Sequence, residues 1–209
     1  MDTYNDVEFD VEELLVTNGM IQDYFWLQDM KQRKLFINEI IDPTIVSDIV
    51  KSILQFNKDD KGIPYEERRP ILLYISTNGG DVDAGFELID VIIASKTPVY
   101  TINLGYCYSM GFLIYLAGHK RICSENSKFL MHDGTSAVFN SSSKVKDQLL
   151  FNDKVEDRIK HFVLEKTNIS EKEYNKKLRT EWYMFADEAK ENGITDEIIG
   201  QDCDIDKII

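Results

Sequence analysis

Hydrophobic residues follow two alternating patterns from about residue 34 onward. Short runs rich in branched and aromatic side chains predict buried strands, and longer stretches with apolar residues three or four positions apart predict amphipathic helices. The expected strands cover residues 35–37, 71–76, 99–102, 121–123 and 129–131. This alternation of strand and helix patterns favours an α/β fold with parallel strands.

Local end signals place the helices. Asp42 followed by Pro43 is typical of a helix N-terminus, Pro98 requires the preceding helix to end before it, and Gly193 is typical of a helix C-terminus. The turn at residues 124–127 is expected to join its two flanking strands as a hairpin. The expected helices cover residues 43–56, a segment around 86–93, the later part of 105–118, and residues 143–166, 170–178 and 186–192.

Composition and charge narrow the class of protein. The chain has 209 residues, enough for one domain with a sizeable core, and its net charge of −13 argues against binding a phosphate backbone. The first thirty residues are acidic, which predicts no export signal, and the apolar stretch at residues 112–117 is too short to span a membrane. Three cysteines without a CxxC pair predict free thiols and no zinc site, so we expect a cytoplasmic protein.

Two segments carry candidate chemistry. Gly79 and Gly80 end a predicted strand, and Ser109 stands at the start of a predicted apolar helix. Taken singly, a glycine pair usually permits tight packing and such a serine usually caps a helix. Together they offer a nucleophilic hydroxyl and backbone N–H donors that could form an oxyanion hole.

A serine nucleophile needs a general base, and the chain has three histidines. His119 lies in a polar turn and His161 in a charged helix, so both are expected to be solvated. His132 follows an apolar strand, at the sheet edge where catalytic groups of α/β proteins gather. His132 is therefore the candidate base, although its position alone also fits a purely structural histidine.

Four segments together resemble a known family. They are residues 74–85 (YISTNGGDVDAG), 105–111 (GYCYSMG), 126–132 (NSKFLMH) and 186–196 (ADEAKENGITD). Their sequences, order and spacing resemble the proteolytic subunit of the Clp protease. The resemblance extends over most of the chain, from about residue 25 to residue 199.

The resemblance implies a crotonase-like α/β fold of the Clp proteolytic-subunit type, built from repeated β-turn-α units. A peptidase domain would cover residues 25–199 and include a protruding helix–strand handle at about 133–166. An acidic N-terminal segment, residues 1–24, would precede this domain. An acidic C-terminal tail, residues 200–209, would follow it.

The resemblance also implies the roles of individual residues. Ser109 would be the nucleophile, His132 the general base, and the backbone N–H groups of Gly80 and Met110 the oxyanion hole. Glu181 stands where the family has its catalytic aspartate. A glutamate can orient a histidine if the backbone sits back to accommodate the extra methylene.

Two departures from the family pattern leave alternatives open. Asp133, directly after the candidate base, could hold the histidine instead of Glu181. Arg179 and Thr180 stand where the family usually has an acidic residue followed by an arginine, a pair associated with contacts between rings. These changes motivate an alternative function as a catalytically impaired scaffold or regulatory subunit of a mixed assembly.

The implied partners follow from the family. Its members form heptameric rings, usually stacked in pairs as tetradecamers, and cleave unfolded polypeptides delivered by an AAA+ unfoldase. The chain has no GxxxxGK[ST] motif, so ATP would belong to the partner. We expect no metal, cofactor, nucleic acid or membrane to take part.

An acyl-CoA enzyme of the crotonase type is a more distant alternative, because such enzymes do not need the Ser109 and His132 pair.

Overall fold

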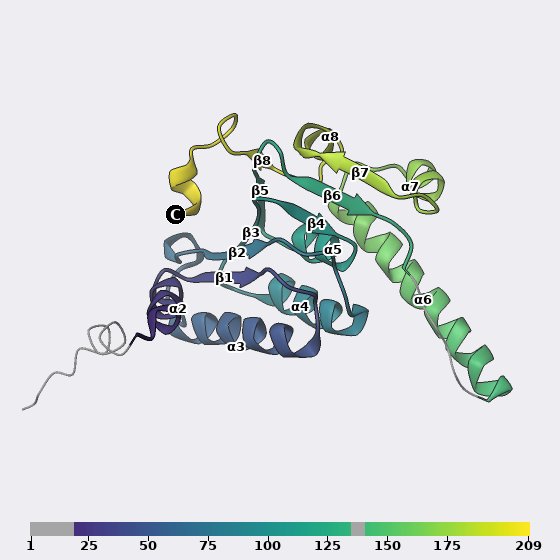
Figure 1. Cartoon of the computed structure of the whole chain (residues 1–209), viewed down its shortest axis with the longest axis horizontal. Coiled ribbons are helices and arrows are strands. Elements are labelled where there is room, and N and C mark those ends of the chain that lie inside the picture. Colours follow the sequence, from purple (N-terminus) through teal and green to yellow (C-terminus); the bar gives the residue numbers. More distant parts are fainter. Residues whose placement is uncertain (1–18, 135–140) are drawn as a thin grey trace, which may run out of the picture.

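Strands and helices alternate along the chain (Figure 1). The computed structural model describes residues 19–134 and 141–209. The strands are β1 (Lys34–Ile37), β2 (Ile71–Ile75), β3 (Val99–Asn103), β4 (Tyr106–Tyr108), β5 (Lys120–Cys123), β6 (Lys128–Met131), β7 (Trp182–Phe185) and β8 (Glu197–Ile198). The helices are α2 (Ile21–Lys31), α3 (Pro43–Asp59), α4 (Val82–Ala94), α5 (Met110–Leu116), α6 (Ser142–Lys166), α7 (Glu171–Lys177) and α8 (Ala186–Glu191), with short 3-10 helices η1 (Tyr65–Glu67) and η2 (Ile205–Ile208).

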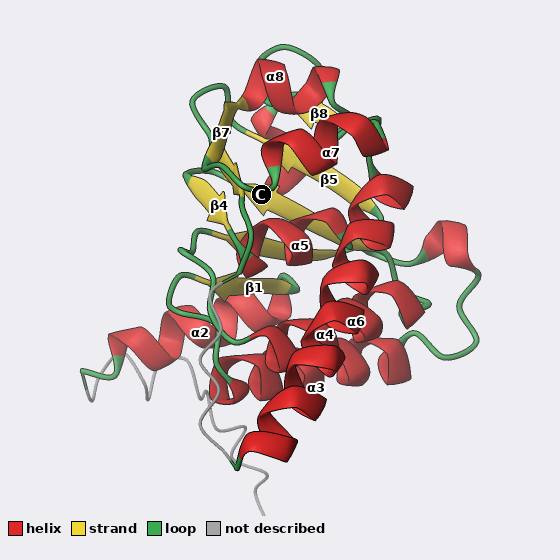
Figure 2. Cartoon of the chain, turned by 90° about the vertical axis from the view of Figure 1, so that its right-hand side faces the viewer, coloured by secondary structure: helices red, strands yellow, loops and turns green. Residues whose placement is uncertain are grey.

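The strands form two sheets. The larger has the order β1-β2-β3-β5-β8, and all its neighbouring strands are parallel. The smaller has the order β4-β6-β7, with β4 parallel and β7 antiparallel to β6. In Figure 2, α3 and α4 lie at one end of the molecule and α7 and α8 at the other, with α5 between them. The expected α/β fold with mostly parallel strands is confirmed.

The hairpin expected around residues 124–127 is wrong, because β5 and β6 belong to different sheets. The end of β3 determines this change of sheet. The carbonyl oxygen of Asn103 accepts hydrogen bonds from the Ser127 hydroxyl (2.6 Å) and the Ser124 amide (3.0 Å), and the Asn103 side chain donates to the Lys128 carbonyl (3.0 Å). The turn is thus attached to β3, and the chain leaves it in the direction of the smaller sheet.

The predicted helices are present, with small changes at their ends. Asp42 caps α3 as expected, since its carboxylate accepts hydrogen bonds from the amides of Thr44 (2.8 Å) and Ile45 (3.0 Å). Five apolar residues on one face of α3 are buried: Val46, Ile49, Val50, Ile53 and Phe56. They join the main core, which also includes side chains from β1, β2, α4 and α5. This core supports the segments that precede and follow the candidate nucleophile.

The C-terminal residues pack on the larger sheet. Ile208, in η2, is 2% exposed and belongs to a second apolar cluster with Leu72, Ile102 and Ile122. The Tyr74 hydroxyl donates a hydrogen bond to the Ile208 carbonyl. Residues 205–208 therefore cover part of one face of the sheet.

Helix α6 projects away from the rest of the molecule (Figure 1). Near its C-terminal end, Val163 is fully buried in the core, whereas Leu149, Leu150 and Phe151 are at least half exposed. No helix among the described residues is long and apolar enough to cross a membrane. Residues 135–140 of the expected handle, and residues 1–18 of the expected acidic segment, lie outside the described part of the chain.

Candidate active site

Ser109 occupies a sharp turn between β4 and α5. Its backbone angles, φ +53° and ψ −121°, are unusual for a residue other than glycine, and such a conformation costs on the order of 1–3 kcal/mol. Hydrogen bonds on both sides hold it: the Ser109 amide donates to the Leu130 carbonyl (3.0 Å), and the Phe112 amide donates to the Ser109 carbonyl (3.0 Å). A strained turn of this kind is a known way of presenting a nucleophilic serine.

The Gly79–Gly80 turn packs directly against Ser109. A Cβ atom added to Gly79 would lie 2.8 Å from the Ser109 Cβ and 3.0 Å from the Met110 nitrogen, and its φ of +101° also favours glycine. Gly80, with φ +153°, packs equally closely on Ile41, since an added Cβ would lie 2.2 Å from the Ile41 carbonyl oxygen. The two glycines thus allow three backbone segments to meet beside the candidate nucleophile.

The expected oxyanion-hole residues, Gly80 and Met110, flank Ser109 on these segments. Within residues 19–134 and 141–209, the backbone amides of Gly80 and Met110 have no hydrogen-bond partner. Backbone N–H groups without a partner can donate to an oxygen that becomes negatively charged. The Gly79 amide, by contrast, donates to the Thr77 hydroxyl (3.1 Å).

Thr77 shapes this turn, and the sequence analysis did not identify it. Its side chain is buried, and its hydroxyl donates to the Glu39 carbonyl (2.5 Å) while accepting from the Gly79 amide. Thr77 therefore links the segment after β1 to the glycine turn. A threonine directly before Asn-Gly-Gly was the available signal, because hydroxyl side chains commonly bond to the backbone within turns.

Strand pairing brings His132 and Glu181 together. In the antiparallel pair of β6 and β7, Leu130 lies opposite Tyr183 and Met131 lies opposite Trp182. The next residues along this register are His132 and Glu181, and side chains of residues that oppose each other lie on the same face. The His132 Nδ1 atom is 3.0 Å from the Glu181 Oε1 atom.

Among the described residues, Glu181 is the carboxylate within hydrogen-bond distance of the His132 ring. Asp133, the alternative partner, has a backbone amide that donates to the Leu178 carbonyl (3.0 Å), which connects the end of β6 to the segment before Glu181. The Glu181 side chain is 57% exposed and the His132 side chain 25% exposed. The pair therefore lies at the mouth of the site, where water also reaches the carboxylate.

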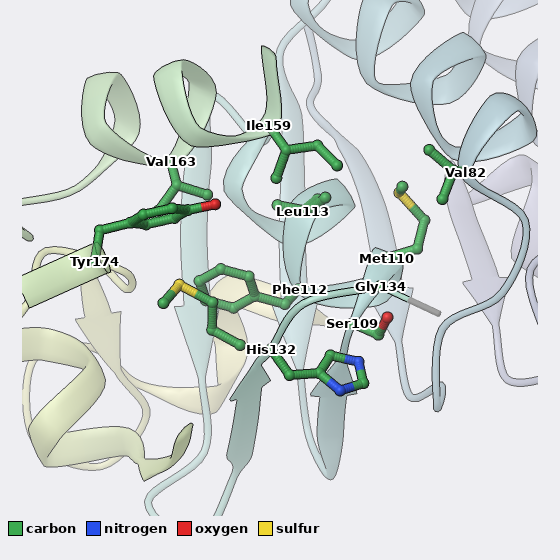
Figure 3. A pocket seen from close by; sticks show the side chains of 11 residues that line it. Val82, Ser109, Met110, Phe112, Leu113, His132, Gly134, Ile159, Val163 and Tyr174 are labelled. Atoms are coloured by element: carbon green, nitrogen blue, oxygen red, sulfur yellow. The ribbon is translucent and has the colours of Figure 1, made fainter. Parts of the chain in front are cut away.

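Ser109 and His132 line the same small cavity, which has a volume of about 60 Å³. Figure 3 shows their side chains next to each other at one end of it. Most of the remaining wall is apolar and comes from α5 and α6, including Leu113, Ile159 and Val163. The structure thus places the selected hydroxyl and imidazole on one cavity and the selected carboxylate against the imidazole, while the Ser109 hydroxyl makes no hydrogen bond to His132 or to any other described residue.

The other histidines lie elsewhere and have local partners. The His119 Nδ1 atom accepts a hydrogen bond from the Val99 amide (3.1 Å), and burial lowers the pKa of this histidine. The His161 Nδ1 atom is 2.6 Å from the Asp157 carbonyl oxygen, one helical turn earlier. Neither side chain lines the cavity at Ser109.

Cys107, two residues before Ser109, belongs to the core. Its side chain is fully buried, and burial raises the pKa of its thiol well above the usual value. A thiol is a strong nucleophile only as the thiolate. Cys107 is therefore a small core residue and not a second nucleophile.

Comparison with known proteins identifies the family. The sequence profile of the Clp protease family matches residues 18–202, nearly the whole chain and all of the site described above. The chain belongs to the Clp protease family. This membership confirms the resemblance found in the sequence and the Clp-type α/β fold.

The alignments with three relatives in this family cover most of the length of each relative. The chain is 26% identical over 188 residues to "ATP-dependent Clp protease proteolytic subunit 2" of Treponema pallidum, an alignment covering 89% of this chain and 92% of the relative. It is 29% identical over 173 residues to the protein of the same name from Prochlorococcus marinus, covering 80% and 82%. With the Treponema denticola protein of that name, identity is 33% over 132 residues, covering 62% and 66%.

Replacement of Gly79 tests the close packing at the candidate nucleophile, Ser109. We expect Gly79→Ala to lower kcat/KM for peptide hydrolysis by about 10²-fold, because the new methyl group must displace Ser109 or Met110 and small misplacements at a reacting centre cost about that much. Gly62→Ala is the matched control: φ is +94° there, but an added Cβ would contact nothing within 4 Å. Equal activity of the two folded variants, measured with one fluorogenic peptide, would contradict this account.

Proposed function

We propose that this chain is a serine endopeptidase that cleaves unfolded polypeptides by acyl transfer through Ser109, His132 and Glu181. The observation that carries the proposal is the 3.0 Å contact between His132 Nδ1 and Glu181 Oε1, at a cavity that Ser109 also lines. A hydroxyl, an imidazole and a carboxylate in this order form a catalytic triad on several unrelated folds. Family membership independently supports peptidase chemistry.

In the first half of the reaction, the Ser109 hydroxyl attacks the peptide carbonyl carbon and His132 accepts its proton at Nε2. Glu181 accepts a hydrogen bond from Nδ1–H and stabilises the imidazolium that forms. The amides of Gly80 and Met110 donate to the oxyanion, and each such donor contributes about 3 kcal/mol in comparable hydrolases. His132 then returns the proton to the leaving amine as the C–N bond breaks.

The second half releases the acyl group. A water molecule attacks the ester carbonyl of the acyl-enzyme, and His132 accepts a proton from this water. The same two amides stabilise the second oxyanion. Collapse of the intermediate breaks the ester bond, His132 returns the proton to Ser109, and the free acid leaves.

The proposal includes assembly into heptameric rings of identical subunits, stacked in pairs, in the cytoplasm, with an AAA+ unfoldase that hydrolyses ATP. The names of the relatives, which describe proteolytic subunits of an ATP-dependent protease, support this assignment. The half-exposed Leu149, Leu150 and Phe151 on the projecting part of α6 also support it, because neighbouring apolar side chains on a surface often mark an interface.

Two observations favour a second candidate, a scaffold subunit with weak or no activity. The Glu181 side chain is 57% exposed, so water competes for its hydrogen bond to His132. Arg179 and Thr180 also depart from the family pattern at the positions just before Glu181.

Peptide hydrolysis by the purified chain separates the two candidates. We expect the wild-type protein to hydrolyse a short fluorogenic peptide and an unfolded protein substrate, with the activity in the fraction whose mass corresponds to a ring. Light scattering on the same fraction gives that mass. An intact ring that hydrolyses neither substrate would contradict the peptidase proposal and support the scaffold.

A further inference from the structure

The cavity that begins at Ser109 extends inward between three helices. Phe112 and Leu113 of α5 form one wall, and Ile159 and Val163 of α6 form another. In a serine peptidase, the pocket beside the nucleophile receives the side chain of the residue whose carbonyl group is attacked, the P1 residue. The described wall is almost entirely apolar, so a charged P1 side chain would lose its hydration without gaining a group of opposite charge.

One polar group interrupts this wall. Tyr174 of α7 is 2% exposed and lines the cavity across from Ser109 and His132 (Figure 3). The Tyr174 hydroxyl has no hydrogen bond to another described residue. In the described part of the chain, every fully enclosed polar side-chain atom does have a hydrogen-bond partner, so this hydroxyl is not fully enclosed. The hydroxyl oxygen is therefore accessible, and Figure 3 shows it on the side of Tyr174 that faces Leu113 and Ile159 of the cavity wall. Burial raises the pKa of Tyr174 to about 12, which keeps the phenol neutral and able to donate.

The cavity is small. Ser109 and Tyr174 both line it, yet its volume is about 60 Å³, whereas a cavity that binds benzene has a volume of about 150 Å³. An unbranched side chain therefore fits this small space better than an aromatic ring. A side chain long enough to cross it would bring its tip to the Tyr174 hydroxyl.

We propose that Tyr174 makes this pocket select an unbranched, uncharged P1 side chain with a hydrogen-bonding tip, of which glutamine is the natural example. This inference rests on the proposed peptidase function. The Tyr174 hydroxyl donates to the amide oxygen of glutamine, whereas an apolar side chain of the same length would bury that hydroxyl without a partner. Sites that offer a hydrogen bond reject analogues lacking the partner more strongly than apolar sites reject an added or missing methylene.

Three peptides that differ only at P1 test the proposal. They carry glutamine, norleucine, which is unbranched but has no hydrogen-bonding atom, or glutamate, which has the shape of glutamine with a charge. We expect wild-type kcat/KM to be about tenfold higher for glutamine than for norleucine, and the glutamate peptide to be cleaved more slowly than both.

The decisive comparison is with Tyr174→Phe, which removes a single oxygen atom. We expect this variant to lose the preference for glutamine. The ratio of kcat/KM for the glutamine peptide to kcat/KM for the norleucine peptide should fall about tenfold relative to the wild type, while kcat/KM for the norleucine peptide stays the same or rises. Norleucine cleavage also shows that the variant is folded. Tyr65→Phe is the matched control, because Tyr65 is 52% exposed, lies in η1 and does not line the cavity, and its ratio should equal that of the wild type.

The outcomes separate this inference from the function on which it rests. If wild type and Tyr174→Phe cleave norleucine peptides but have the same glutamine-to-norleucine ratio, the inference about Tyr174 is wrong and the peptidase function stands. If the wild type cleaves none of the three peptides nor an unfolded protein substrate, both are wrong.

Discussion

Ser109→Ala is expected to lower kcat for peptide hydrolysis by about 10⁴- to 10⁶-fold, the largest effect of any single substitution considered. The expected loss is this large because, in the proposed mechanism, the hydroxyl forms the covalent bond of the acyl-enzyme, and removal of such a nucleophile in a serine protease costs on the order of 10⁶-fold. Any remaining rate would come from binding and from the proposed oxyanion donors, the amides of Gly80 and Met110. Initial rates with a fluorogenic peptide measure the effect.

The control for Ser109→Ala removes a serine hydroxyl that lies away from the candidate active site. Ser52→Ala, on α3, deletes a hydroxyl that donates to the Asp48 carbonyl (2.9 Å) of its own helix, and we expect it to keep full activity. The mass of the assembly should be the same for wild type and both variants. Ser109→Ala protein of unchanged mass that kept a tenth of the activity would show that another group is the nucleophile.

Glu181→Gln is expected to lower kcat by about 10²- to 10⁴-fold. Replacement of the triad carboxylate by its amide costs about 10⁴-fold in a well-studied serine protease, because the histidine loses both its correct tautomer and the charge that stabilises its protonated form. The exposure of Glu181 favours the lower part of this range, since water can replace some of the lost hydrogen bonding. Glu181→Asp keeps the charge but shortens the side chain, so it should retain more activity than Glu181→Gln.

Two further variants complete this test. Glu173→Gln removes a carboxylate from the exposed surface of α7 and should have wild-type activity. Asp133→Asn removes the alternative partner of His132 and should change kcat by less than tenfold. If Asp133→Asn caused the large loss and Glu181→Gln did not, His132 would be oriented by Asp133 and the assignment of Glu181 would be wrong.

The sequence allowed much of the fold to be predicted because its strands and helices have clear periodicity. The apolar runs of β1, β2 and β3 were sufficient to predict these three strands, and the capping residue Asp42 was sufficient to predict where α3 begins. Strands β4 and β7 were missed, because the three residues of β4 lie in the stretch interpreted as a loop before the apolar helix, and the four residues of β7 lead directly into α8 without a turn residue between them. The false hairpin arose because its true partner, the end of β3 at Asn103, is more than twenty residues away in sequence.

Part of the candidate site was predictable because some of its residues have local sequence signals. Ser109, His132 and the glycine turn have local signals, namely a helix start, a strand end and a glycine pair. The contact between His132 and Glu181 depends on the register of β6 and β7, which no local pattern specifies. Tyr174 was missed because an aromatic residue on an amphipathic helix is usually a core residue, and only the structure shows that its hydroxyl oxygen is accessible.

The central claim is that Ser109 is a hydroxyl nucleophile activated by the neighbouring His132. Mass-spectrometric mapping of the adduct formed with a serine-directed fluorophosphonate tests it most directly, because the reagent bonds covalently to an activated serine. We predict one adduct per chain, on the peptide that contains Ser109, and none in His132→Ala protein of the same assembly mass. An adduct on a different serine, or no adduct on wild-type protein that cleaves peptides, would contradict the claim.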